Sequence, residues 1–139
     1  MEVTVRRMSG ARFEARARGL AVVVDRLPEA GGPGDGFRPT ELVLAGLGAC
    51  MAGTMITFAE NQGIEVGDVI VELGSEDAKA PRRIGAVTVR LVVGGDLTER
   101  EMQSLERVAA ACKIGTTLQT PTDVELVFEH RPAQAANVD

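Results

Sequence analysis

The chain has 139 residues, a formal net charge of −5 and neither Trp nor Tyr. This length suits one domain built around one main core. The acidic balance argues against a broad nucleic-acid interface, and the 3% aromatic content argues against base-stacking platforms. We therefore expect no nucleic-acid partner, a single domain over residues 1–130, and a frayed polar tail over residues 131–139.

The first strand-like segment, residues 1–8, alternates charged and apolar side chains. A secretory signal would instead run apolar toward a cleavage site, so we predict a cytoplasmic protein. Two cysteines are too few for a disulfide framework. In a reducing compartment, a disulfide between them would be transient and catalytic rather than structural.

The N-terminal third predicts an antiparallel meander followed by a loop. Residues 2–8, 13–18 and 20–27 alternate or are rich in valine, with turns at the glycines between them. Residues 28–36 are rich in Gly and Pro, which predicts an irregular connector. The loop lacks the Lys of a phosphate-binding P-loop, and the third Gly of a dinucleotide fingerprint would fall on Pro39.

A long central helix is predicted to begin at Pro39, where a missing N–H costs nothing, and to end near Gln62, with Gly63 as its stop. Its apolar residues go all the way round, so we expect it to be buried on most sides. No charge occurs between residues 41 and 60, a length that could cross a bilayer. Its glycines and threonines dilute the hydrophobicity, so we predict a buried helix and no membrane partner.

The C-terminal half predicts two further strands, a helix and a last strand. Residues 65–74 and 84–93 alternate as a long antiparallel pair. Thr98 and Glu101 form a capping box that opens an amphipathic helix ending near residues 112–115. Alternating apolar residues over 124–128 predict the last strand. The predicted fold class is α+β, with antiparallel sheets, a long buried central helix and a second helix.

Several site chemistries fit the sequence poorly. The only histidine is His130, and the two cysteines stand 62 positions apart, which leaves no close ligand pair for structural zinc. Serine-hydrolase chemistry, or acyl transfer through Cys50, would have to use that same histidine as its base. We therefore predict no metal and no cofactor.

Cys50 and Cys112 remain as candidates for chemistry, although both also fit as small, buried packing residues. A reactive cysteine needs its thiolate stabilised. Cys50 lies roughly three turns inside its helix, too far for the helix dipole to act. A cation must then come from elsewhere, and Arg12 or Arg38 is the leading supplier, with Glu41 available to orient it.

A family resemblance favours a chemical role for the two cysteines over a packing role. The stretch FRPTELVLAGLGAC, residues 37–50, resembles the central-helix motif of the OsmC/Ohr proteins, the osmotically inducible protein C and organic hydroperoxide resistance family. The segment AAACKI, residues 109–114, matches the position of the family's second cysteine. The order of strands and helices agrees from about residue 3 to residue 128.

This resemblance implies an intertwined homodimer with two active sites at the subunit interface. It implies that Cys50 attacks the O–O bond of an organic hydroperoxide, or of hydrogen peroxide, and that Cys112 resolves the resulting sulfenic acid. A small or protein dithiol would then reduce the disulfide. By position, Arg12 is the closest match to the family's activating arginine, and Glu41 to its glutamate.

Two departures mark a divergent OsmC-like branch. Thr40 separates Pro39 from Glu41, and Lys113 follows the second cysteine, where a proline is often found. They leave a second hypothesis open, in which the dimer lacks peroxidase activity and binds a small apolar or thiol-bearing ligand.

Overall fold

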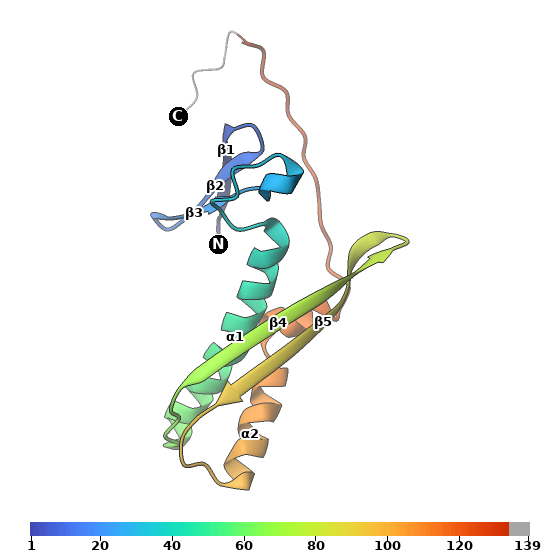
Figure 1. Ribbon diagram of the computed structural model, residues 1–139. Coiled ribbons are helices and arrows are strands. Elements are labelled where there is room, and N and C mark those ends of the chain that lie inside the picture. The colour runs from blue at the N-terminus through green and yellow to red at the C-terminus, as the bar shows by residue number, and fades with distance from the viewer. Residues whose placement is uncertain (134–139) are drawn as a thin grey trace.

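The computed structural model describes residues 1–133 and is an α+β chain with antiparallel sheets and one long helix (Figure 1). This confirms the predicted fold class. The elements, in chain order, are β1 Thr4–Ser9, β2 Arg12–Ala17, β3 Leu20–Val24, a 3-10 turn Pro28–Ala30, α1 Pro39–Gln62, β4 Val69–Lys79, β5 Arg82–Val93, α2 Glu99–Ala110 and α3 Lys113–Leu118.

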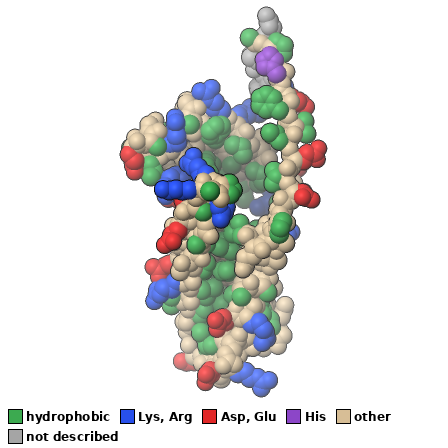
Figure 2. Space-filling view, turned by 90° about the vertical axis from the view of Figure 1, so that its right-hand side faces the viewer, with side chains coloured by type: hydrophobic (Ala, Val, Ile, Leu, Met, Phe, Trp, Pro, Cys, Tyr) green, Lys and Arg blue, Asp and Glu red, His purple; other side chains and the backbone are tan. Residues whose placement is uncertain are grey.

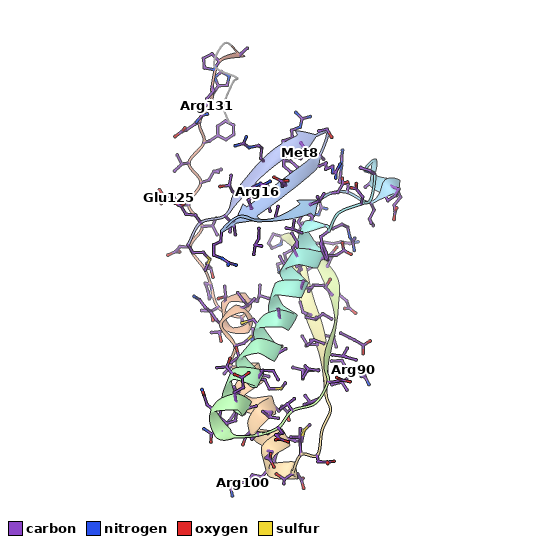
Figure 3. All side chains as sticks on the ribbon, turned by 90° about the vertical axis from the view of Figure 1, so that its left-hand side faces the viewer. Met8, Arg16, Arg90, Arg100, Glu125 and Arg131 are labelled. Carbon is purple, nitrogen blue, oxygen red and sulfur yellow. The ribbon has the colours of Figure 1, made fainter. Side chains whose placement is uncertain are left out.

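Strands β1, β2 and β3 form the predicted N-terminal meander. Glycines with positive φ, Gly10 at 53° and Gly19 at 83°, make its two turns. Within residues 1–133, the sheet makes no substantial contact with the helices or with β4 and β5. It stands beyond the N-terminal end of α1, and Met8 and Arg16 lie there, far from Arg100 on α2 (Figure 3).

Helix α1 has the bounds that the sequence predicts, because each end carries its own signal. Pro39 is its first residue, and Gly63 ends it with φ of 68°. At the start, Glu41 Oε1 accepts a hydrogen bond of 2.8 Å from the backbone N–H of Arg38. This bond satisfies one of the donors that a helix start leaves free.

One side of α1 is covered within the chain and the other is not. Leu47, Gly48, Met55 and Ala59 are buried against neighbouring elements, whereas Ala45, Ala49 and Gly53 are exposed. The expectation that α1 is buried on most sides is therefore wrong for a single chain. By length and composition alone, α1 could also cross a membrane, with a hydropathy of 1.9. Here it packs against β4, α2 and α3 of its own chain.

The hairpin β4–β5 and helix α2 close the core around the C-terminal half of α1. Buried Met55 and Ala59 of α1 meet buried Leu105 and Ala109 of α2. The capping box that starts α2 forms as predicted: Thr98 Oγ1 accepts from the N–H of Glu101, at 3.1 Å. Helix α2 therefore packs along the C-terminal half of α1.

We expect Leu105→Ala to destabilise the chain by about 2–5 kcal/mol, because Leu105 is 1% exposed and its truncation leaves a cavity. Urea unfolding at a fixed protein concentration measures this. Met102→Ala on the same helix is the control: Met102 is 40% exposed, and its loss should cost less than about 1 kcal/mol. Equal losses for the two variants would contradict this account of the core.

The predicted last strand is absent from this chain. Residues 121–132 carry no regular structure, and Val124, Leu126 and Phe128 are 83–89% exposed. The alternation is present, but a strand also needs an edge to pair with, and here the segment runs unpaired toward the N-terminal sheet (Figure 1). Figure 2 shows apolar side chains gathered in the hollow between this segment and the sheet.

Smaller differences concern boundaries. β4 extends to Lys79, so the expected charged loop is a tight turn at Ala80–Pro81. The expected irregular connector holds a short 3-10 turn. The second helix stops at Ala110, and a separate helix, α3, begins at Lys113. The expected tail lies mostly outside the described residues, and the single-domain boundary at residue 130 stays a prediction.

Candidate thiol site

The fold brings Cys50 and Cys112 together. Cys50 lies at the middle of α1, and Cys112 lies in the short link where α2 ends and α3 begins. Because α2 and α3 both pack on α1, the two thiols lie close enough for each to shift the pKa of the other. Both cysteines are free thiols, Cys50 half-buried and Cys112 only 1% exposed.

Backbone amides of α3 point at both sulfurs. The N–H of Ile114 donates to Cys50 Sγ at 3.4 Å, and the N–H of Gly115 donates to Cys112 Sγ at 3.2 Å. A Cβ at position 115 would lie 3.1 Å from Cys112 Sγ and 3.6 Å from Leu47 Cδ1. Glycine therefore allows the backbone to approach this closely.

The two thiols have pKa values displaced in opposite directions. The pKa of Cys50 is lowered, chiefly by the Ile114 amide, against opposing burial, and further by the Cys112 thiol and the Thr54 hydroxyl. The pKa of Cys112 is raised, chiefly by burial. A thiolate is therefore favoured on Cys50, with Cys112 as the neighbouring proton donor.

The predicted charged residues lie elsewhere in the single chain. Arg12 forms an ion pair with Asp35 at 3.3 Å, and Arg38 Nε lies 3.5 Å from Glu41 Oε1. Glu41 precedes Cys50 by nine residues, which on a helix is about two and a half turns, so the two side chains lie on opposite faces and about 13 Å apart along the axis. Within one chain the structure thus unites the two cysteines and brings neither Arg12, Arg38 nor Glu41 to them.

A cavity of about 460 Å³ opens beside the thiol pair, between α1, β5 and α3. Its wall includes Leu47, Met51 and Gly115, and a Cβ built at Gly115 would lie 3.1 Å from the Cys112 sulfur. None of its lining residues is charged: Val43, Leu47, Met51, Ile84, Gly85, Ala86, Val87, Val89, Gly115, Leu118 and Gln119. Such walls suit an uncharged organic group. Within residues 1–133, no cluster of His, Cys, Asp or Glu could hold a metal ion.

The model of the OsmC-like protein family matches residues 32–127, the span that contains both cysteines. The chain belongs to the OsmC-like family. Its relatives include proteins of osmotic stress and of hydroperoxide resistance. A search of curated proteins finds no match.

Solved structures of OsmC-like proteins share the fold at low identity. A protein from Psychrobacter arcticus 273-4, described as an osmotic-stress-induced and detoxification response protein, has a TM-score of 0.76 at 20% identity, over 83% of this chain and 85% of that chain. An organic hydroperoxide resistance protein from Legionella pneumophila has 0.65 at 21%, over 86% and 90%. Bacillus subtilis OhrB has 0.60 at 20%, over 86% and 91%.

Sequence reasoning missed Thr54, Ile114 and Gly115 in this OsmC-like site. Thr54 follows Cys50 by one helical turn, so its spacing could have been noticed. Ile114 and Gly115 act through backbone N–H groups, which carry no side-chain signature.

Cys50 should be alkylated by iodoacetamide at lower pH than an ordinary cysteine. Its lowered pKa keeps the thiolate populated as pH falls below the normal thiol range, and alkylation stops only below the lowered value. Cys112, with its raised pKa, should need a higher pH than the same residue in the denatured chain. Mass spectrometry of each cysteine peptide against pH measures both, with denatured protein as the control. If Cys50 gave the same alkylation profile in the folded and the denatured protein, stabilisation of its thiolate by the Ile114 amide would be contradicted.

Proposed function

We propose that this OsmC-like protein is a cytoplasmic, thiol-dependent peroxidase that reduces organic hydroperoxides in oxidative-stress defence. The observation that carries the proposal is that two free thiols, each accepting from a backbone N–H of α3, have pKa values displaced in opposite directions. The uncharged cavity beside them adds a place for an organic substituent. Relatives described as hydroperoxide resistance proteins support the same reaction class.

The proposed reaction has three steps. The Cys50 thiolate attacks the terminal peroxide oxygen, the O–O bond breaks, and the alkoxide takes a proton and leaves as an alcohol, with a sulfenic acid on Cys50. The Cys112 sulfur then attacks the Cys50 sulfur and releases water, which forms the disulfide. An external dithiol reduces this disulfide by two exchanges and is itself oxidised.

A coupled assay tests this proposal. Cumene hydroperoxide or tert-butyl hydroperoxide is supplied with a dithiol reductant, and peroxide loss is followed per mole of protein. We expect many turnovers per chain, and faster turnover with the organic peroxides than with hydrogen peroxide, which cannot use the apolar cavity. Stoichiometric or no consumption would instead favour the second hypothesis, a non-enzymatic dimer whose uncharged cavity binds a small apolar or thiol-bearing ligand.

We further propose that the active form is a homodimer. One face of the N-terminal sheet, which carries Phe13, Ala15 and Val22, packs on no other element of the described chain. An apolar sheet face is normally buried against another element of the fold. The exposed small-residue face of α1 and the unpaired apolar alternation over 124–128 are further surfaces that a second copy would cover. We propose that the arginine acting on Cys50 comes from that second copy.

Sedimentation equilibrium tests the homodimer. A mass of twice 14.7 kDa is expected at micromolar concentration. Leu126→Asp, which places a charge on the unpaired segment, should weaken association. A monomer with native thermal stability would contradict the homodimer while leaving the thiol chemistry open.

A further inference from the structure

Helix α3 starts on a sulfur atom. Its N-cap is Cys112, whose Sγ accepts a hydrogen bond of 3.2 Å from the N–H of Gly115. The N–H of Ile114, one residue earlier, donates to Cys50 Sγ at 3.4 Å. Helix caps are usually Ser, Thr, Asp or Asn, whose side-chain oxygens satisfy the free N–H groups of the first turn. In α3, two consecutive N–H groups of that turn depend on the two thiols instead.

The length of α3 makes this cap important. The helix spans six residues, Lys113–Leu118, and isolated helices of fewer than about 12 residues are marginal in water. At its far end, Thr117 Oγ1 donates to the carbonyl oxygen of Lys113, and Gln119 Nε2 donates to that of Gly115. Both bonds join residues one turn apart, so they form only while the helix is wound. The start of α3 is therefore held by the two sulfurs and by packing on α1.

Oxidation of the two thiols to a disulfide weakens both sulfur acceptors. A disulfide holds its sulfurs about 2.05 Å apart, so Cys50 Sγ and Cys112 Sγ must draw toward each other and away from the amides that now donate to them. The bonded sulfurs also carry no charge, and hydrogen bonds to a neutral acceptor are about half as strong as those to an anion. The first turn of α3 then loses its cap, which favours unwinding.

Helix α3 also covers the site. Gly115, Leu118 and Gln119 belong to the wall of the 460 Å³ cavity. Cys112 is 1% exposed, and the backbone of Gly115 lies directly against its sulfur, so an external dithiol cannot reach that sulfur while α3 stays wound. Unwinding would uncover the disulfide and widen the cavity. The alcohol product could then leave, and the reductant could enter.

We propose that α3 is a redox-gated lid, wound and capped by the Cys112 sulfur when both cysteines are thiols, and unwound when they form a disulfide. This inference rests on the disulfide step of the proposed function. It gives Cys112 a second task besides resolution, because the same sulfur keeps the site covered until it is oxidised.

Hydrogen exchange of the amides over residues 113–118, followed by mass spectrometry, tests the lid in the full chain. Diamide forms the disulfide without peroxide, because it takes two electrons and two protons from the two thiols. The oxidised protein should exchange these amides about tenfold faster than the reduced protein. Helix α2 is the internal control: its cap is Thr98 Oγ1, which oxidation leaves unchanged, so its exchange should stay the same. Equal exchange of α3 in the two states overturns the proposal.

Two substitutions of Cys112 separate capping from oxidation. Cys112→Ala removes the cap from a protein that cannot form the disulfide, so its α3 amides should exchange rapidly without any oxidant. Cys112→Ser keeps a capping atom, the hydroxyl oxygen, so α3 should exchange as slowly as in the reduced parent, with or without diamide. Slow exchange in Cys112→Ala, or a diamide response in Cys112→Ser, overturns the proposal.

The same samples separate the lid from the proposed peroxidase. If diamide forms the disulfide and unwinds α3, whereas cumene hydroperoxide leaves both thiols free, the peroxidase fails and the lid stands. If cumene hydroperoxide forms the disulfide while α3 exchanges as in the reduced protein, the lid fails and the peroxidase keeps its support.

Discussion

Cys50→Ser is expected to stop peroxide consumption, with a loss of about a thousandfold or more relative to the parent protein. A serine hydroxyl remains protonated where the Cys50 thiol is partly ionised, and the Ile114 amide then has no anion to stabilise. Cys112 cannot replace it as the nucleophile, because it is 1% exposed and burial raises its pKa. The coupled peroxide assay measures the loss.

Ala80→Ser is the control for this variant. It adds the same hydroxyl at an exposed position in the turn between β4 and β5, outside the surfaces assigned to the second copy, and leaves both thiols in place. It should retain turnover close to that of the parent. If Cys50→Ser retained a tenth or more of the parental rate, Cys50 would not be the nucleophile.

Cys112→Ser should separate the first turnover from the later ones. Cys50 still reacts, so about one mole of peroxide per mole of protein is consumed in a rapid phase. Without a second sulfur to attack it, the sulfenic acid persists, and we expect steady turnover to fall about a hundredfold. Rapid-quench measurement of the first phase, followed by trapping of the sulfenic acid with dimedone, tests both parts.

The outcome that counts against a resolving role for Cys112 is steady turnover at the parental rate in Cys112→Ser. External dithiol would then reduce Cys50 directly, and the contact between the two sulfurs would serve only to tune the thiolate. Loss of the first phase as well would indicate that Cys112 is needed to position Cys50.

Local signals predicted much of this fold. Pro39 and Gly63 predicted the two ends of α1. The missing N–H of proline costs nothing at the first helical position, and glycine readily adopts the left-handed conformation that ends a helix. Thr98 and Glu101 fixed the start of α2 for a similar reason. The alternation over 84–93 indicated β5, since its inward side chains contribute to one core.

The features that the sequence did not predict depend on packing between segments that are far apart in the chain. The apolar circumference of α1 indicates that partners cover it, without saying whether they come from the same chain. Val124, Leu126 and Phe128 alternate as a strand does, yet no edge of the described chain pairs with them. Cys50 and Cys112 were candidates from the sequence, but only the family resemblance favoured their acting together, because their closeness depends on how α2 and α3 pack on α1.

One measurement tests the central claim, that Cys50 and Cys112 form a redox pair, most directly. The reduced protein is treated with one equivalent of cumene hydroperoxide, and its intact mass and cysteine peptides are determined without reductant. We predict a loss of about 2 Da, no remaining free thiol, and one peptide pair joined through Cys50 and Cys112. An unchanged mass, or added oxygen with both peptides still separate, would contradict it.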